Sequence, residues 1–347
     1  MSFFRRAIER QWYQDRPSWL LGLRPLEALY RAVVARRRQG YQQQLERVQH
    51  PGVPVIVVGN LTVGGSGKSP VVAALAQFFQ QQGWRPGIVS RGYGGQAPHY
   101  PYLVSADTTA AQVGDEPQML FEQLALPVAV APDRAAAARL LVEQGCDLLL
   151  ADDGLQHWAL GRDLELVVID GQRGFGNQHC LPVGPLREPL TRLAQVDALL
   201  VQGAPSEDLG RLLEPVPVTA WSYGLKTLGW RRGDGHWQYN CPFAAGQAVQ
   251  ALAGIGHPQR FFDQLQALGL QVSGYPLADH AVMDANTLGR LSAAPLPWVM
   301  TAKDAVKLRP WLNEQHWVQE VCADLPKEFL YQLHLQVQQL KEEKYHG

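Results

Sequence analysis

Residues 62–69 have the types and spacing of a phosphate-binding loop. They read Thr-Val-Gly-Gly-Ser-Gly-Lys-Ser and lie between a predicted buried strand over 53–58 and a predicted helix that begins near Lys68. In such a loop, backbone N–H groups surround the phosphates, the lysine neutralises oxygens that gain charge, and the last hydroxyl binds Mg²⁺. We therefore predict an ATP site that comprises Thr62, Val63, Gly64, Gly65, Ser66, Gly67, Lys68 and Ser69, with Ser69 as a metal ligand.

The first position of the loop departs from the usual pattern, which has glycine there. Thr62 occupies that position in this chain. Because glycine adopts backbone conformations that other residues avoid, we expect Gly64 and Gly65 to supply the curvature. A surface loop that happens to contain Gly-Lys-Ser is the alternative, and the strand–loop–helix context disfavours it.

A second candidate site is the pair of carboxylates Asp152 and Asp153. They follow the apolar run Leu-Leu-Leu-Ala at 148–151, which predicts a buried strand. Such a strand would deliver both carboxylates to the sheet edge at which the loop also opens. One of them could then hold Mg²⁺ directly or through water. A simple turn or helix cap is the alternative for an Asp-Asp pair.

These two motifs predict nucleotide binding without separating a kinase from an NTP-driven switch. Membrane-associated partitioning ATPases share the Gly-Gly-x-Gly-Lys loop but carry a lysine directly before the paired glycines. Val63 stands at that place here. Other residues must therefore decide between the two classes.

The elements that position these motifs alternate between short apolar strands and helical stretches. The chain has 347 residues, 46% hydrophobic and 18% charged, which is enough for an ordered core. The alternation predicts a P-loop NTPase-like α/β fold, a mainly parallel sheet with helices on both faces. We expect four regions: basic amphipathic helices over 1–45, a nucleotide-binding domain over 46–211, an extended or hairpin linker over 212–245, and a smaller α/β domain over 246–347.

The N-terminal region has an unusual charge. Residues 1–50 hold ten arginines and four acidic residues, a formal charge of +6, and the other 297 residues carry −7 of the total of −1. Aromatic residues among these arginines and an amphipathic pattern over 23–34 suit a membrane interface. A helical arm that packs on the domain or on a second subunit is the alternative.

The composition narrows the possible partners and the compartment. No apolar run reaches the roughly 18 residues of a transmembrane helix, so we expect membrane contact to be peripheral. The near-neutral total charge disfavours nucleic acid as a partner. Four scattered cysteines lack zinc spacing and fit a reducing cytoplasm.

Eight sequence blocks spread along the chain form a recognisable set. They are Gly59–Pro70, Ser90–Gly94, Val113–Pro117, Asp152–His157, Pro185–Pro189, Ala253–Gly256, Asp279–His280 and Thr301–Ala305. These blocks resemble the motifs of the tetraacyldisaccharide 4′-kinases, the lipid A 4′-kinases of Gram-negative bacteria. Three positions depart from that family's pattern: Leu155 replaces Phe, His257 replaces Asn, and Ala302 replaces Glu, which removes a carboxylate.

The resemblance implies an activity, a substrate and an architecture. ATP would phosphorylate the 4′-hydroxyl of a tetraacylated glucosamine disaccharide 1-phosphate. The fold would contain two α/β/α units joined by a two-stranded linker, with the active site in the cleft between them. An enzyme of this kind would work peripherally at the cytoplasmic face of the bacterial inner membrane.

The resemblance implies roles for two further residues, and the chemistry of their side chains suggests roles for two more. Asp115 resembles the family's proposed general base and His280 the group that pairs with it; a turn residue and an ordinary surface or core histidine are the alternatives. We expect Arg187 to contact phosphate oxygens and Glu188 either to join Mg²⁺ coordination or to hold Arg187. An exposed ion pair of these two neighbours is the alternative. Gln156 and His157 rank lower, as substrate or supporting groups.

Two other functions stay open on the sequence alone. One is a P-loop kinase for a soluble substrate, with the N-terminal helix used for dimerisation. The other is a membrane-recruited NTPase switch that has no phosphoryl acceptor. The sequence determines neither protein partners, oligomeric state nor acyl-chain preference, nor which of Asp152 and Asp153 holds the metal.

Overall fold

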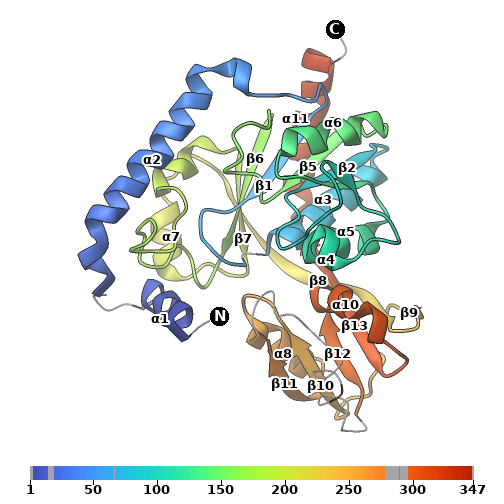
Figure 1. Ribbon diagram of the computed structural model, residues 1–347. Helices are drawn as coiled ribbons and strands as arrows, with labels where there is room; N and C mark the ends of the chain where they lie inside the picture. The colour runs from blue at the N-terminus through green and yellow to red at the C-terminus, as the bar shows by residue number, and fades with distance from the viewer. Residues whose placement is uncertain (1–2, 15–18, 66, 278–288, 290–295, 346–347) are drawn as a thin grey trace.

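The computed structural model describes residues 3–14, 19–65, 67–277, 289 and 296–345. Within these residues, thirteen strands form one continuous sheet that passes through two α/β units. The strand order is β11-β10-β12-β13-β8-β7-β6-β1-β5-β2-β4-β3, and β9 pairs with β8 (Figure 1).

The larger unit is built around β1 (Val55–Gly59), whose five residues are all buried. β1 pairs in parallel with β5 (Leu148–Asp152) and β6 (Leu164–Asp170), and Val58 is in register with Asp152. The end of β1 therefore lies beside the first of the predicted carboxylates. The sheet continues through β2 (Pro86–Ser90), β4 (Val128–Val130) and β3 (Tyr102–Leu103) on one side and β7 (Ala198–Gln202) on the other.

Helices cover both faces of this part of the sheet because its strands are apolar on both sides. Ile56 and Val58 pack into one core with α3 (Lys68–Gln81), α4 (Ala110–Val113), α5 (Asp115–Leu124) and α11 (Lys327–Leu340). Val55 and Val57 pack into the opposite core with α6 (Arg134–Glu143) and α7 (Glu207–Leu213). The prediction of a mainly parallel sheet between two helical layers is confirmed.

The smaller unit repeats this layering on a shorter sheet. β10 (Ala248–Ala253) pairs in parallel with β11 (Gln271–Pro276) and β12 (Trp298–Thr301). Helix α8 (Pro258–Ala267) packs against one face through Phe261, Phe262 and Leu265, and α10 (Ala302–Leu308) packs against the other.

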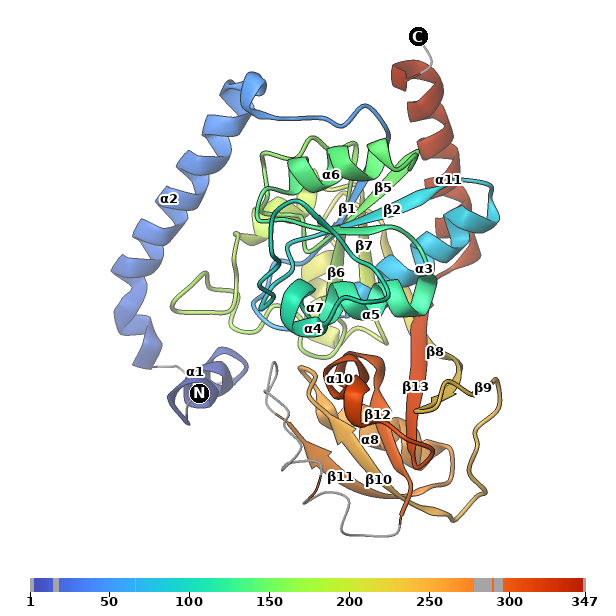
Figure 2. The ribbon, with the colours of Figure 1, turned by 45° about the vertical axis from the view of Figure 1, so that its right-hand side comes forward.

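Two long strands join the units (Figure 2). β8 (Ala220–Arg232) pairs with β7 at its start and then antiparallel with β13 (His316–Asp324), and β9 (Trp237–Gln238) pairs with its end. The chain thus leaves on β8 and returns on β13. The second connecting strand lies outside the predicted linker of 212–245. Helix α11, predicted within 246–347, packs on α3 of the larger unit. The division of the chain into the four predicted regions stays a prediction.

The N-terminal helices follow the outside of the larger unit (Figure 1). They are α1 (Phe3–Trp12) and α2 (Arg24–Gln43), with a 3₁₀ turn at Trp19–Leu23. Helix α2 buries the acidic side chain of Glu27, which accepts a hydrogen bond from the backbone N–H of Cys180 at 2.8 Å. Leu26, Leu29 and Val33 are instead 52%, 62% and 58% exposed. This inverts the usual arrangement, in which the apolar side of a surface helix faces the core.

Neither α1 nor α2 resembles a membrane span. No helix in the part of the chain that the structure describes is both long and apolar enough to cross a bilayer.

Candidate active site

The phosphate-binding loop connects β1 to α3. Gly64 and Gly67 have φ angles of 107° and 77°, a region that favours glycine. A Cβ atom on Gly67 would also lie 2.7 Å from the side-chain oxygen of Gln202. Thr62 forms an antiparallel bridge with Leu186 and has no positive φ, so glycine is not needed there. Ser66 lies outside the described residues.

Lys68 is held at the end of β1 by two side chains. Its Nζ donates to Oδ1 of Asn60 at 3.2 Å and lies 3.5 Å from Oδ1 of Asp153. Asn60 is fully buried and also donates to the backbone oxygen of Thr62 at 2.8 Å. Asn60 was assigned no role from sequence, although it is the first polar residue after the apolar strand.

Asp152 pairs with the other end of the loop motif. Oγ of Ser69 donates to Oδ2 of Asp152 at 3.3 Å, and Asp152 is 2% exposed. Its Oδ1 has no hydrogen-bond partner within the described parts of the chain. Burial raises the pKa of this carboxyl above its ordinary value, and the negative charge of Glu116 adds to the effect. A cation placed here would restore the ionised form.

The side chains of Ser69 and Asp152 fit a magnesium ion. No group of three or more His, Cys, Asp or Glu residues in the described ranges could hold a metal by itself. Mg²⁺ usually takes only one or two protein carboxylates and completes its shell with water and substrate phosphates. Ser69 and the free oxygen of Asp152 are ligands of that kind.

Asp153 has the opposite environment from its neighbour. Its carboxylate accepts two hydrogen bonds from Nη1 of Arg187, at 2.9 and 3.0 Å, and faces Lys68. Burial alone would raise its pKa, but Lys68 and Arg187 outweigh burial and lower the pKa to about 2. Its backbone adopts a left-handed conformation with φ of 51°, which costs strain for a residue other than glycine. Asp153 therefore organises cations and stays ionised.

Arg134 is a site residue that the sequence analysis missed. It is the first residue of α6, and its Nη2 donates to the backbone oxygen of Asp153 at 3.1 Å. Burial lowers the pKa of its guanidinium to about 10. Its position resembled an ordinary helix start, so only the proximity of α6 to the Asp153 turn could have revealed it.

Glu188 and Arg187 face different partners. The Glu188 carboxylate is buried, accepts from Nε2 of Gln156 at 2.8 Å and lies 3.6 Å from Nε of Arg192. Gln156 in turn accepts from Arg187 at 3.3 Å. The alternative of an exposed ion pair between the two neighbours is therefore wrong. Glu188 contacts Gln156, which in turn contacts Arg187, so these contacts match the expected role of Glu188 in holding Arg187 in place. Metal binding by Glu188 stays a prediction.

Three arginines gather around Trp158, next to Glu188, and only Arg192 of the three is buried. Arg38 of α2, Arg162 and Arg192 each lie 5.1–5.2 Å from the ring centroid of Trp158. Glu165 pairs with both Arg162 and Arg192. His157 accepts from the backbone N–H of Arg134 at 3.3 Å, and burial together with Arg134 and Arg162 lowers its pKa to about 4. His157 is thus a neutral supporting group.

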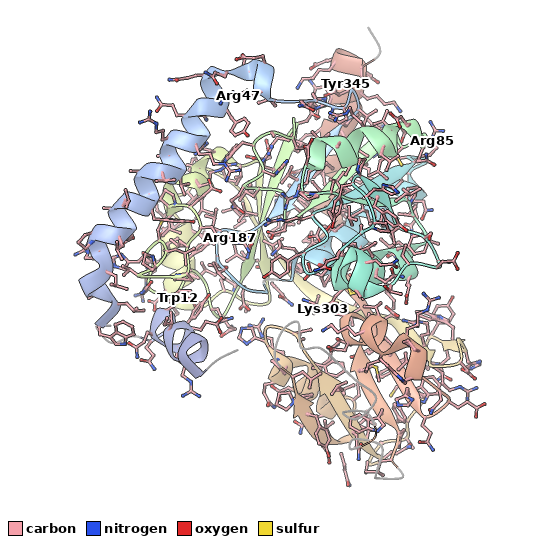
Figure 3. All side chains as sticks on the ribbon, in the orientation of Figure 1. Trp12, Arg47, Arg85, Arg187, Lys303 and Tyr345 are labelled. Atoms are coloured by element: carbon pink, nitrogen blue, oxygen red, sulfur yellow. The ribbon has the colours of Figure 1, made fainter. Side chains whose placement is uncertain are left out.

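Asp115 lies where the smaller unit meets the larger one. It is the first residue of α5, and Gly114 is the N-cap, without a side-chain cap bond. Its Oδ2 lies 3.3 Å from Nζ of Lys307, and Glu116 pairs with Lys303 at 3.1 Å. Figure 3 labels Lys303 at this junction and Arg187 within the larger unit. His280, the predicted partner of Asp115, lies outside the described residues.

The smaller unit also reaches the loop itself. A Cβ atom on Gly256, which follows β10, would lie 3.3 Å from the Cα atom of Gly65. Arg260 of α8 donates to both oxygens of Asp170, at the end of β6, at 2.7 Å each. The predicted nucleotide loop therefore lies at the junction of the two units.

Comparison with protein families gives one match over most of the chain. The family model described as tetraacyldisaccharide-1-P 4′-kinase matches residues 19–338. A tetraacyldisaccharide 4′-kinase of Pseudomonas putida is 46% identical over 327 residues, which cover 93% of this chain and 94% of that protein. Its counterpart in Tolumonas auensis is 43% identical over 96% of this chain and 98% of that protein.

A solved structure shows the same architecture. The LpxK protein of Aquifex aeolicus, crystallised in complex with ATP, is 25% identical with a TM-score of 0.76. The alignment covers 92% of this chain and 99% of that one.

Proposed function

The chain belongs to the tetraacyldisaccharide-1-P 4′-kinase family, and we propose that it transfers the γ-phosphoryl group of ATP to the 4′-hydroxyl of a tetraacylated glucosamine disaccharide 1-phosphate. This reaction is a step of lipid A biosynthesis. One observation carries the proposal: the charged and polar groups that phosphoryl transfer needs lie together at one edge of the sheet, next to the junction of the two units. They are Lys68, the Ser69–Asp152 pair and the Asp153–Arg187 pair, and Asp115 lies at the junction itself.

The loop side of the site supplies the charges that phosphoryl transfer needs. Lys68 and Arg187 share the Asp153 carboxylate, which holds both cations at the same strand end. Charge on the equatorial oxygens grows during transfer, and fixed cations stabilise it without reorganisation. Arg134 adds a third cation, which is buried and which no sequence motif indicated.

Mg²⁺ is the metal that these residues fit best. Bound between the phosphates and the protein, it would neutralise charge and orient the γ-phosphoryl group. Ser69 and Asp152 would hold it, while Asp153 keeps its cations. We assign the metal to Asp152 because the ion pairs of Asp153 occupy both of its oxygens.

On the acceptor side, we assign Asp115 as the proton acceptor for the sugar hydroxyl, with His280 as its partner. Asp115 lies in the first turn of α5, after the N-cap Gly114, and its carboxylate pairs across the junction with Lys307 at 3.3 Å. A carboxylate at this place can accept the proton as the bond to phosphorus forms.

Membrane contact is the remaining part of the proposal. The outward face of α2 carries Leu26, Leu29 and Val33, and the basic N-terminal segment suits anionic headgroups. We propose peripheral binding at the cytoplasmic face of the inner membrane.

Changing Leu26, Leu29 and Val33 together to serine should lower binding to anionic vesicles by about 10-fold or more, because apolar burial is lost. Tyr30→Phe on the inner face serves as the control. Unchanged vesicle binding in the triple variant would contradict this surface.

The activity is tested with purified protein, γ-labelled ATP, Mg²⁺ and the disaccharide 1-phosphate in detergent micelles. We expect label in the lipid, and mass spectrometry of the product should place the new phosphate at the 4′ position. Label in a soluble acceptor alone, or hydrolysis without labelled lipid, would contradict the proposal in favour of a soluble-substrate kinase or a switch, respectively.

A further inference from the structure

Helix α10 carries two lysines toward the beginning of α5. Figure 2 shows α10 beneath α4 and α5, at the place where the units meet. Lys303 pairs with Glu116, and Lys307 places its Nζ between two carboxylates, 3.3 Å from Asp115 and 3.4 Å from Asp304. The Lys307 side chain is 8% exposed and that of Asp304 is fully buried. Lys307 therefore links Asp115 to the interior of the smaller unit.

Asp304 extends this link to the phosphate loop. Its Oδ2 accepts from the backbone N–H of Gly254 at 2.9 Å and from Oγ1 of Thr301 at 2.6 Å. Gly254 begins the turn 254–256, whose last residue abuts Gly65. One continuous set of contacts thus runs from Asp115 through Lys307 and Asp304 to the nucleotide loop.

The contribution of Lys307, Asp115 and Asp304 to folding stability does not by itself explain why three charges lie together at this junction. Removing charges from water is costly, and apolar side chains of similar volume often replace buried ion pairs without loss of stability. Geometry is the stronger reason. An ammonium between two carboxylates holds both at a fixed separation, and one of the two is the carboxylate assigned above as the proton acceptor.

We infer that Lys307 is a positioning residue for phosphoryl transfer: with Asp304, it holds the Asp115 carboxylate at a fixed place relative to the phosphate loop. The inference rests on the proposed function, because it takes Asp115 as the group that acts on the acceptor hydroxyl. It assigns Lys307 no contact with ATP or lipid.

The second ionic link between the units provides a matched control. Arg260 also joins the smaller unit to the larger one, but it pairs with Asp170 at the end of β6. If Lys307 only docks the units, Lys307→Met and Arg260→Met should act alike. If Lys307 positions Asp115, the kcat loss caused by Lys307→Met should require Asp115, whereas the loss caused by Arg260→Met should not.

The test measures lipid phosphorylation by the full chain, for Lys307→Met and Arg260→Met, each alone and combined with Asp115→Asn. Lys307→Met should lower kcat by about 100-fold, the usual effect of misplacing a reacting group. The KM for ATP should change little. In the Asp115→Asn background, the same substitution should change kcat by no more than about twofold, whereas the Arg260→Met loss should be the same in both backgrounds.

A Lys307→Met loss of equal size in both backgrounds would overturn the inference. If Lys307→Met does not fold, as judged by its melting curve, Lys307→Arg replaces it, because arginine keeps the charge. The kcat loss of Lys307→Arg should be smaller, and it should again disappear in the Asp115→Asn background. A loss that persists in the Asp115→Asn background would overturn the inference. Wild-type kcat in Asp115→Asn would overturn the inference and leave the kinase activity intact. A wild-type chain that labels no lipid would overturn the proposed function, and the inference with it.

Discussion

The two sides of the site differ in how the chain assembles them. On the loop side, Lys68 lies in the segment after β1, Asp152 is the last residue of β5, and Asp153 follows it; β1 and β5 are neighbours in one sheet. On the other side, Glu116 and Lys303 are 187 positions apart in the chain and meet only because β8 and β13 hold the smaller unit in place. The loop side therefore depends on a single strand register, whereas the acceptor side depends on the docking of two units.

Lys68→Ala is the largest expected break on the loop side. We expect kcat to fall by about 10³-fold with little change in melting temperature, because the lost charge stabilises the transition state more than the ground state. Lys226→Ala, on the exposed face of β8, is the control. Near-normal turnover of Lys68→Ala at saturating ATP would remove the loop from the mechanism.

The neighbouring carboxylates should respond differently to loss of charge. Asp152→Asn should raise the Mg²⁺ concentration for half-maximal activity by about 100-fold, because a direct ligand is lost. Asp153→Asn should mainly raise the KM for ATP, because Lys68 and Arg187 lose their common partner. Titration of activity with Mg²⁺ for both variants checks this. If only Asp153→Asn changed the Mg²⁺ requirement, the two roles would be exchanged.

A smaller effect, on the pH dependence of folding stability, is expected from His157, which accepts a hydrogen bond from the backbone N–H of Arg134. Its folded-state pKa of about 4 lies below the ordinary value of 6.5, because of burial and then the nearby Arg134 and Arg162. The unfolded chain therefore binds the proton more readily, so stability is fully present above about pH 6.5 and falls as the pH drops toward 4. By pH 5 the loss should reach about 2 kcal/mol.

Denaturant unfolding of wild type and His157→Gln between pH 7 and 5 measures this contribution. The variant should lose less stability over this range, since glutamine can still accept the bond from Arg134 but does not titrate. Parallel curves for the two proteins would show that His157 is not held neutral.

The loop side was also the more predictable from sequence. The glycine-rich motif and Asp152–Asp153 directly follow apolar strands, so their meeting at one sheet edge could be derived. Arg134 was missed because its sequence signature is that of any helix start. Asp304 lay within the matching block Thr301–Ala305 but received no role, and Lys307 was missed. The Lys307–Asp115 contact depends on the docking of α10 against α5, which no local pattern encodes.

Helix periodicity likewise left two placements undetermined. The residues of α11 were assigned to the predicted region 246–347, and their packing on α3 of the larger unit was not foreseen, because periodicity does not specify which core a helix joins. In α2 the apolar residues suggested a helix, and only the structure shows that Glu27 points inward while Leu29 points out.

The most direct test of the account compares the amount of phosphorylated lipid with the amount of ADP formed by the same enzyme sample in micelles. If the loop side and the acceptor side act together, each ATP consumed should yield one lipid 4′-phosphate in the wild type. In Asp115→Asn, lipid phosphorylation should fall by about 100-fold. ADP formed by the wild type without a matching amount of lipid 4′-phosphate would contradict the account.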